Sequence, residues 1–253
     1  APCGRDRVSV VSLRQRRSHA PTGTADDLPL PVVPAEKTAV SVAEVLASWV
    51  PLAASWLVMG LEMPIVSAVM ARLADPEVNL AAYGGVTMPV ALLIEAPIMM
   101  LLSASTALGR DLASYRLMHR FMMGAGLVLT LIHAAFAFTP LFDWVLVPLL
   151  GPPEEIIGPA RLGLQVTLPW TWAIAHRRYH QGLLIRFGRS RHVTIGTIVR
   201  VIVMTATVLT AALLGAQGIV AAGLAITTGV IAEAVYCRLA VAPVIAGPLA
   251  RAA

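Results

Sequence analysis

The run of residues 79–108, NLAAYGGVTMPVALLIEAPIMMLLSASTAL, decides the fold class of this chain. It holds one charged side chain, Glu95. A helix needs about 20 apolar residues to cross the hydrocarbon core of a bilayer, and this run exceeds that length without the alternation of a half-buried strand. The run therefore predicts a membrane-spanning helix. Pro89 and Pro97 predict irregular points within it, because proline removes a hydrogen bond of the helix.

Five further runs have the same apolar character, at residues 44–73, 114–139, 159–186, 191–215 and 217–242. The whole chain of 253 residues is 57 % hydrophobic and 13 % charged, whereas soluble domains carry about 25 % charged residues. We therefore expect an all-α, polytopic integral membrane protein with about six transmembrane helices. The composition excludes an ordinary soluble enzyme, a disordered tail and a fibrous repeat.

The two ends of the chain differ from its middle. Residues 1–42 carry six basic side chains followed by a proline-rich run, which predicts a flexible basic extension of extended character. Residues 43–243 contain the six apolar runs and form the expected transmembrane domain. Residues 244–253 are expected to be a short C-terminal tail.

Basic residues gather in alternate connections between the apolar runs. The extension, the second and fourth connections and the C-terminal end are rich in arginine, whereas the first and third connections are acidic and the fifth is uncharged. Because basic residues favour the cytoplasmic side, this alternation predicts an even number of spans with both termini in the cytoplasm. We expect the plasma membrane, the inner membrane of a bacterium. The net charge of +5 then sets orientation, and no nucleic acid partner is expected.

Three carboxylates fall inside predicted spans: Glu62, Glu95 and Glu233. A charge at the centre of a bilayer costs about 3 kcal/mol or more, so such a group faces a bundle interior or a wet cavity. Glu62 precedes Pro64 by two residues and Glu95 precedes Pro97 by two, which combines a titratable group with freed backbone carbonyls. Both are candidate sites for a coupling ion, H⁺ or Na⁺. The alternative is a protonated or arginine-paired glutamate that holds helices together, the interpretation preferred for Glu233.

The fourth apolar run contains the polar cluster HRRYHQ, which starts at His176. In a continuous helix His176 and His180 share one face, Arg177 and Gln181 share the next, and Arg178 lies beyond. These residues predict a basic lining that favours an anionic substrate. The alternative is the cytoplasmic end of a helix whose side chains reach to the interface. The cluster lacks a nearby carboxylate or cysteine, so no metal site is expected there.

The sequence lacks the motifs that carry enzymatic chemistry. It has two cysteines, Cys3 and Cys237, at opposite ends of the chain, which excludes a disulfide framework. It has no phosphate-binding loop, no haem motif and no Ser-His-Asp arrangement of usable spacing. We expect no enzyme, no catalytic residue and no cofactor.

Short segments of the chain resemble the N-terminal half of the progressive ankylosis protein family, in the same order and with matching spacing over about residues 45–240. That family is similar to the multidrug and toxin extrusion (MATE) proteins, in the superfamily of multidrug, oligosaccharidyl-lipid and polysaccharide flippases. The segments are GLE at 60–62, LAAYG at 80–84, EAPI at 95–98, GRD at 109–111, PWT at 169–171 and GLLI at 182–185.

The resemblance implies a fold of two six-helix lobes around a V-shaped cavity, of which this chain supplies one lobe. Ankylosis-like proteins are associated with export of organic anions such as citrate and nucleotides, or of pyrophosphate. MATE proteins exchange sodium or protons for organic cations. Glu62 matches a glutamate in the first helix of the ankylosis-like pattern, so the resemblance implies a role in substrate or ion binding there.

Together these observations predict one lobe of a secondary active exporter that moves a small organic anion by alternating access, coupled to an ion gradient. Its partners would be the lipid bilayer, a small-molecule substrate and either a second six-helix lobe or a second copy of the chain. One alternative is half of a MATE-type organic cation antiporter. An alternative of another class is a non-transporting membrane scaffold or a truncated fragment.

Overall fold

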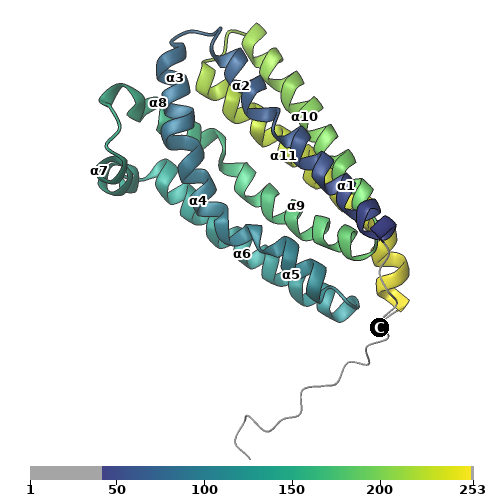
Figure 1. Cartoon of the computed structure of the whole chain (residues 1–253). Helices are drawn as coiled ribbons and strands as arrows, with labels where there is room; N and C mark the ends of the chain where they lie inside the picture. Colours follow the sequence, from purple (N-terminus) through teal and green to yellow (C-terminus); the bar gives the residue numbers. More distant parts are fainter. Residues whose placement is uncertain (1–41, 252–253) are drawn as a thin grey trace, which may run out of the picture. The chain divides into compact units, whose positions relative to one another are not determined.

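The computed structural model describes residues 42–251. Every regular element in this range is a helix (Figure 1), which confirms the all-α fold class. The predicted basic extension, residues 1–42, lies outside the described residues except for Val42. Beyond residue 243 the chain stays helical to residue 251, and residues 252 and 253 of the predicted tail lie outside the described range.

The predicted apolar runs correspond to helices, several of which are divided into shorter pieces. The first run forms α1 (Val42–Met59) and α2 (Glu62–Met70). The second forms α3 (Pro76–Ala82), η2 (Tyr83–Thr87), α4 (Met88–Met99) and α5 (Leu101–Leu108). The other runs form α6 (Leu112–Phe138), α8 (Glu154–Val166), α9 (Leu168–Arg186), α10 (Ser190–Leu213) and α11 (Gly218–Val244). Between the third and fourth runs lie η3 (Phe142–Leu146) and α7 (Val147–Leu150), and η4 (Ile245–Leu249) follows the last run.

Within residues 42–251, five helical segments are long and apolar enough to cross a membrane. They confirm an integral membrane protein. The predicted span 159–186 is not among them: it is divided between α8 and α9, and α9 carries three arginines. A sixth span therefore stays a prediction. The five segments are Val42–Met70, Pro76–Leu108, Leu112–Phe138, Ser190–Leu213 and Gly218–Leu249.

Two prolines explain where the first two apolar runs are interrupted, whereas the expected irregular point at Pro97 is not seen, because Pro97 lies inside the continuous helix α4. The ring of a proline clashes with the carbonyl group four residues earlier. For Pro64 that residue is Gly60, where α1 gives way to α2. For Pro89 it is Gly85, inside the π-helical turn η2. The first break lies two residues before the buried carboxylate Glu62, whereas Glu95 lies ten residues after Gly85, within α4.

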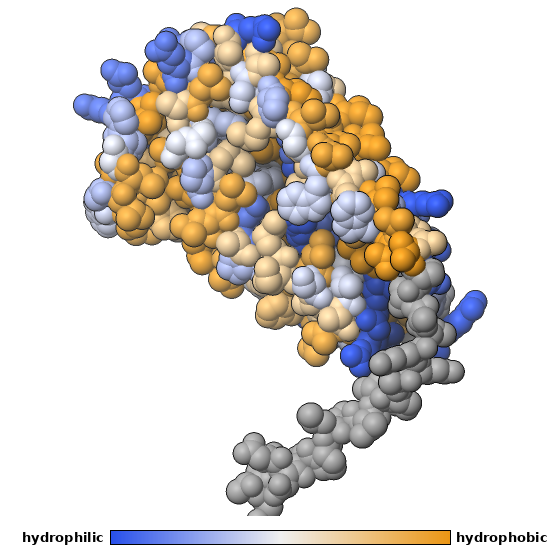
Figure 2. Space-filling view, viewed as in Figure 1, coloured by the Kyte–Doolittle hydropathy of each residue, from blue (hydrophilic) through white to orange (hydrophobic). Residues whose placement is uncertain are grey.

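Helix α9 lies at the centre of the bundle and packs against α4, α5, α6 and α11. Thirteen of its 19 residues are buried, whereas only five of the 27 residues of α6 are. Most of the face drawn in Figure 2 is apolar, and Phe121, Leu131 and Leu213 are among the large apolar side chains that the bundle exposes. The helix with three arginines and no acidic residue is therefore also the one with the largest share of buried residues among the long helices.

The close packing of α5 against α9 depends on a glycine of α9, Gly182. A Cβ atom at Gly182 would lie 1.9 Å from Ser105 Oγ and 2.4 Å from the Leu102 carbonyl oxygen on α5. Contacts this short are impossible, so only glycine permits the observed distance between the two backbones. The hydroxyl of Thr106 reaches the Gly182 carbonyl oxygen at 3.2 Å. This contact fixes α5 against the half of α9 that carries its polar residues.

The connections alternate between the two ends of the bundle (Figure 1). The α5–α6 and α9–α10 connections lie at the same end as the end of α11, and they contain Arg110 and Arg189. The α2–α3, α7–α8 and α10–α11 connections lie at the opposite end. The sequence assigned the arginine-rich connections to one side of the membrane, and in the structure they meet at one end, which is called the basic end below.

Candidate functional site

Glu62 is paired with an arginine that the sequence analysis overlooked. It is the first residue of α2, is 5 % exposed, and its Oε2 accepts a hydrogen bond from Arg200 Nη2 of α10. The two residues are 138 positions apart in the chain. Arg200 lies inside an apolar run, where a charged side chain is as conspicuous in the sequence as the mid-span glutamates are.

Glu233 of α11 is the most fully bonded carboxylate of the bundle interior. Its Oε2 accepts hydrogen bonds from Arg177 Nη1 at 2.8 Å and Arg200 Nη1 at 3.5 Å. Its Oε1 accepts from Gln181 Nε2 at 2.9 Å and Thr197 Oγ1 at 3.3 Å. The preferred interpretation of Glu233, an arginine-paired residue that holds helices together, agrees with this geometry.

Arg200 joins these two carboxylates into one network, because it bonds both Glu62 and Glu233. The network connects α2, α9, α10 and α11. All its charged side chains are buried. A buried ion pair is stable only when its geometry and additional hydrogen bonds offset the loss of hydration. Glu233, with four donors, meets that requirement.

Glu95 of α4 stands in a different environment. It is 2 % exposed and forms no ion pair or hydrogen bond with another residue of the 42–251 range, and its Oε2 is buried without a partner. The charges that act on it are those of Arg177, Arg178 and Arg200. A buried carboxylate that the helix interior leaves unbonded is free to take a proton or a cation.

Arg178 is the corresponding cation. It is 9 % exposed, and its Nε is buried without a partner, as are those of Arg177 and Arg200. Unlike those two arginines, it forms no ion pair within the described part of the chain. The buried cluster thus holds three carboxylates, Glu62, Glu95 and Glu233, and three guanidinium groups, Arg177, Arg178 and Arg200. Its charges balance in number, but Glu95 and Arg178 are not bonded to each other.

The structure divides the predicted basic cluster of α9 between two faces. Arg177 and Gln181 both bond Glu233, which places them on one face, as the helical spacing predicts. His176 and His180 stack at 5.8 Å between ring centroids on another face. The alternative that these side chains reach to the interface is wrong for Arg177, Arg178 and His180, because all three are buried.

His176 and His180 contact aromatic rings and not the carboxylates. His176 lies 5.8 Å from Trp172 and 6.4 Å from His119 of α6, and His180 lies 5.1 Å from Tyr179, measured between ring centroids. His180 Nδ1 is 2.7 Å from the His176 carbonyl oxygen. These two histidines therefore do not belong to the charged cluster, and within residues 42–251 no group of side chains forms a candidate metal site.

A recess is visible on the face of the molecule drawn in Figure 2. Figure 2 shows strongly hydrophilic atoms in a hollow at the middle of the viewed face, between α1 and the arm formed by α4 and α5. The rest of that face is predominantly apolar. Polar atoms at the bottom of a recess in an apolar surface are typical of a binding site built inside a helix bundle.

Comparisons of the chain with models of protein families, with curated proteins and with solved structures found no match. The resemblance to the ankylosis-like and MATE proteins therefore stays a prediction from short sequence segments.

Proposed function

We propose that this chain is one lobe of a secondary active transporter that moves a small organic anion together with a coupling ion. The observation that carries the proposal is the unbonded pair of opposite charges in the buried cluster, Glu95 and Arg178. A group that only stabilises helices is expected to have its partners in place, as Glu233 does. Glu95 and Arg178 instead remain available to ligands.

The balance of charge supplies a coupling mechanism. With Glu95 ionised, the three carboxylates match the three guanidinium groups. A proton on Glu95 leaves one positive charge of the cluster unmatched, and Arg178 then attracts an anion. Departure of the anion restores the preference for an ionised Glu95. The proton and the anion are thereby coupled, and the imposed gradients set the direction of transport.

Glu62 has a reduced role in this proposal. Its pairing with Arg200 makes it part of the network that holds α2 to α10. Glu95 becomes the principal coupling residue, and Arg178 replaces the wider histidine and arginine cluster as the substrate contact. The recess between α1 and the α4–α5 arm is the proposed access path, and a second lobe or a second copy of the chain would complete it.

The test is transport by the purified full chain in liposomes. Radiolabelled citrate is the anionic probe, with an imposed pH gradient or an imposed Na⁺ gradient as driving force. We expect gradient-driven citrate flux in the wild type. Arg178→Gln should lower the rate about tenfold or more, because a charge-assisted hydrogen bond contributes roughly 1.5–3 kcal/mol. Glu95→Gln should leave a flux that no longer responds to the gradient.

Matched controls are Arg120→Gln and Glu154→Gln, since both side chains are exposed and outside the cluster. Equal, gradient-independent citrate flux in wild type and Glu95→Gln would overturn the proposal. Flux of the lipophilic cation tetraphenylphosphonium that requires Glu95 and not Arg178 would instead support the cation antiporter. Folded protein that moves neither probe would favour the scaffold.

A further inference from the structure

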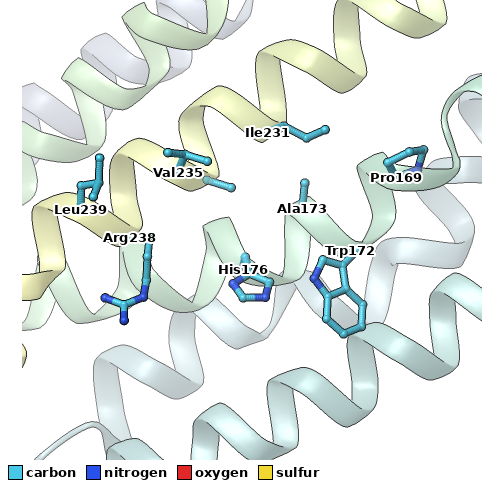
Figure 3. A pocket seen from close by; sticks show the side chains of 9 residues that line it. Pro169, Trp172, Ala173, His176, Ile231, Val235, Arg238 and Leu239 are labelled. Atoms are coloured by element: carbon cyan, nitrogen blue, oxygen red, sulfur yellow. The ribbon is translucent and has the colours of Figure 1, made fainter.

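A cavity outside the charged cluster is lined by residues of α9 and α11. It occupies about 500 Å³ between α9 and α11. Figure 3 shows its labelled side chains along the two helices, with Pro169, Trp172 and His176 from α9 and Ile231, Val235 and Leu239 from α11. Arg177 and Glu233 do not line it. Its volume falls in the usual range for small-molecule sites, about 300–1,000 Å³.

The cavity has one charged end and an apolar body. Arg238 is the only formally charged residue among those that line it, and it is exposed. Within residues 42–251 Arg238 forms no ion pair, although its charge acts on His119 and His176. Away from Arg238 the walls are Val235, Ile231 and the ring of Trp172.

The end of the cavity that carries Arg238 lies toward the basic end of the bundle. Arg238 is six residues before the end of α11, or about 9 Å along the helix axis at 1.5 Å per residue. Ile231 lies seven residues farther from that end, about 10 Å deeper. A ligand in the cavity therefore meets a cation near the membrane surface and hydrocarbon-like walls toward the middle of the bilayer.

We infer that this cavity binds an anionic membrane lipid from the leaflet at the basic end, with its phosphate at Arg238 and one acyl chain between α9 and α11. The depth of the cation and the apolar body match the two parts of such a lipid. Basic pockets between transmembrane helices are known to bind anionic headgroups. A soluble anion would leave the apolar walls unused, and a zwitterionic lipid would lack the net charge that Arg238 attracts.

The test measures lipid bound to the purified full chain by native mass spectrometry. The probes are dioleoyl-phosphatidylglycerol, dioleoyl-phosphatidylcholine and dihexanoyl-phosphatidylglycerol, which vary the charge and the chain length separately. We expect preferential retention of dioleoyl-phosphatidylglycerol. Arg238→Gln should weaken its binding about fivefold, the effect of one basic residue near a membrane surface, and should leave phosphatidylcholine binding unchanged.

Arg120→Gln is the matched control, because Arg120 is exposed on α6 at a similar distance from the basic end and does not line the cavity. If Arg238→Gln and Arg120→Gln weaken the binding of dioleoyl-phosphatidylglycerol equally, the inference is overturned in favour of a general effect of surface charge. Equal binding of the dihexanoyl and dioleoyl lipids would overturn the acyl-chain position.

Ala173→Phe tests the apolar body directly, since Ala173 lines the cavity between the two helices. We expect it to abolish the preference for the long-chain lipid. A photoactivatable diazirine on the acyl chain of phosphatidylglycerol gives a second measurement in the unmodified protein. Crosslinks to residues 231–239 and 169–176 support the site, and crosslinks spread evenly over the exposed helices contradict it.

Discussion

Glu233 and Glu95 are both buried carboxylates on apolar helices, but their surroundings give them opposite effects on stability. Glu233 accepts four hydrogen bonds, two of them from arginines. Glu95 has no bonded partner in the described range. Removing one charge from a fully bonded network leaves its partners as uncompensated charges in the protein interior, which is destabilising. Neutralising an unbonded carboxylate instead removes the cost of burying a charge.

A series of glutamine substitutions should therefore rank the three glutamates. We expect Glu233→Gln to lower the free energy of unfolding by about 3–5 kcal/mol, the cost of breaking a buried ion pair. Glu62→Gln should cost roughly 1–3 kcal/mol, because Arg200 keeps Glu233 as a partner. Glu95→Gln should leave stability unchanged or raised. Thermal unfolding of the purified protein in detergent measures the order, and Glu154→Gln at an exposed position is the control.

An equal loss of stability in all three glutamine variants would contradict this ranking. It would mean that Glu95 has a structural partner comparable with those of Glu233. The ranking is independent of transport, so it separates the geometry of the cluster from its proposed function.

At the scale of elements, the packing of α5 on α9 should be sensitive to a single methyl group. Gly182→Ala places a Cβ against the Leu102 carbonyl oxygen, which belongs to the backbone and cannot rotate away. We expect a loss of about 1–3 kcal/mol from overpacking. Gly158→Ala is the matched control within α8, where a Cβ meets nothing within 4 Å. It should stabilise the protein by about 0.5–1 kcal/mol, and the same unfolding assay compares the two.

The start of α6 has a pH-dependent cap outside the membrane spans. The Ser114 backbone N–H donates to Asp111 Oδ1 at 2.7 Å, and the Ser114 hydroxyl accepts from the Asp111 N–H. The hydrogen bond from the Ser114 backbone lowers the pKa of the Asp111 carboxyl below its ordinary 3.8. Its contribution to stability is therefore fully present above pH 3.8 and is lost as the pH falls through the lower pKa of the folded state.

We expect Asp111→Ala to lower the melting temperature at pH 7, because it removes the cap. The difference from wild type should shrink as the pH is lowered below 4. Melting curves at a series of pH values check this. A difference that stays constant down to pH 2.5 would show that the carboxylate charge contributes nothing to the cap.

At the scale of the whole molecule, hydropathy and charge alternation predicted the helical class, the approximate helix boundaries and the grouping of arginine-rich connections at one end. The prolines at 64 and 89 also explain the breaks in terms of the sequence, because each break lies about four residues before a proline. What the sequence could not provide is the pairing of side chains between helices. Arg200 meets Glu62 across 138 residues, and that contact depends on how α2 and α10 pack.

The same limit explains the fourth apolar run. Its helical spacing correctly separated His176 and His180 from Arg177 and Gln181. How far these side chains are buried depends, however, on the helices that pack around α9. The sequence of one helix does not reveal whether its polar face meets water or other helices. The enclosed position of α9 is a property of the assembled bundle.

The charge of α9 also has a consequence for how the chain enters the membrane during synthesis. Arg177 and Arg178 lie at the middle of the helix, and each opposes insertion by the translocon by about 2.5–3.5 kcal/mol. Glu233, the counter-ion of Arg177, is synthesised 56 residues later. A chain truncated after Leu213 should therefore leave α9 outside the bilayer in a glycosylation-mapping assay, whereas the chain with α11 should insert it. The order in which the helices leave the ribosome would then differ from the order in which they enter the lipid.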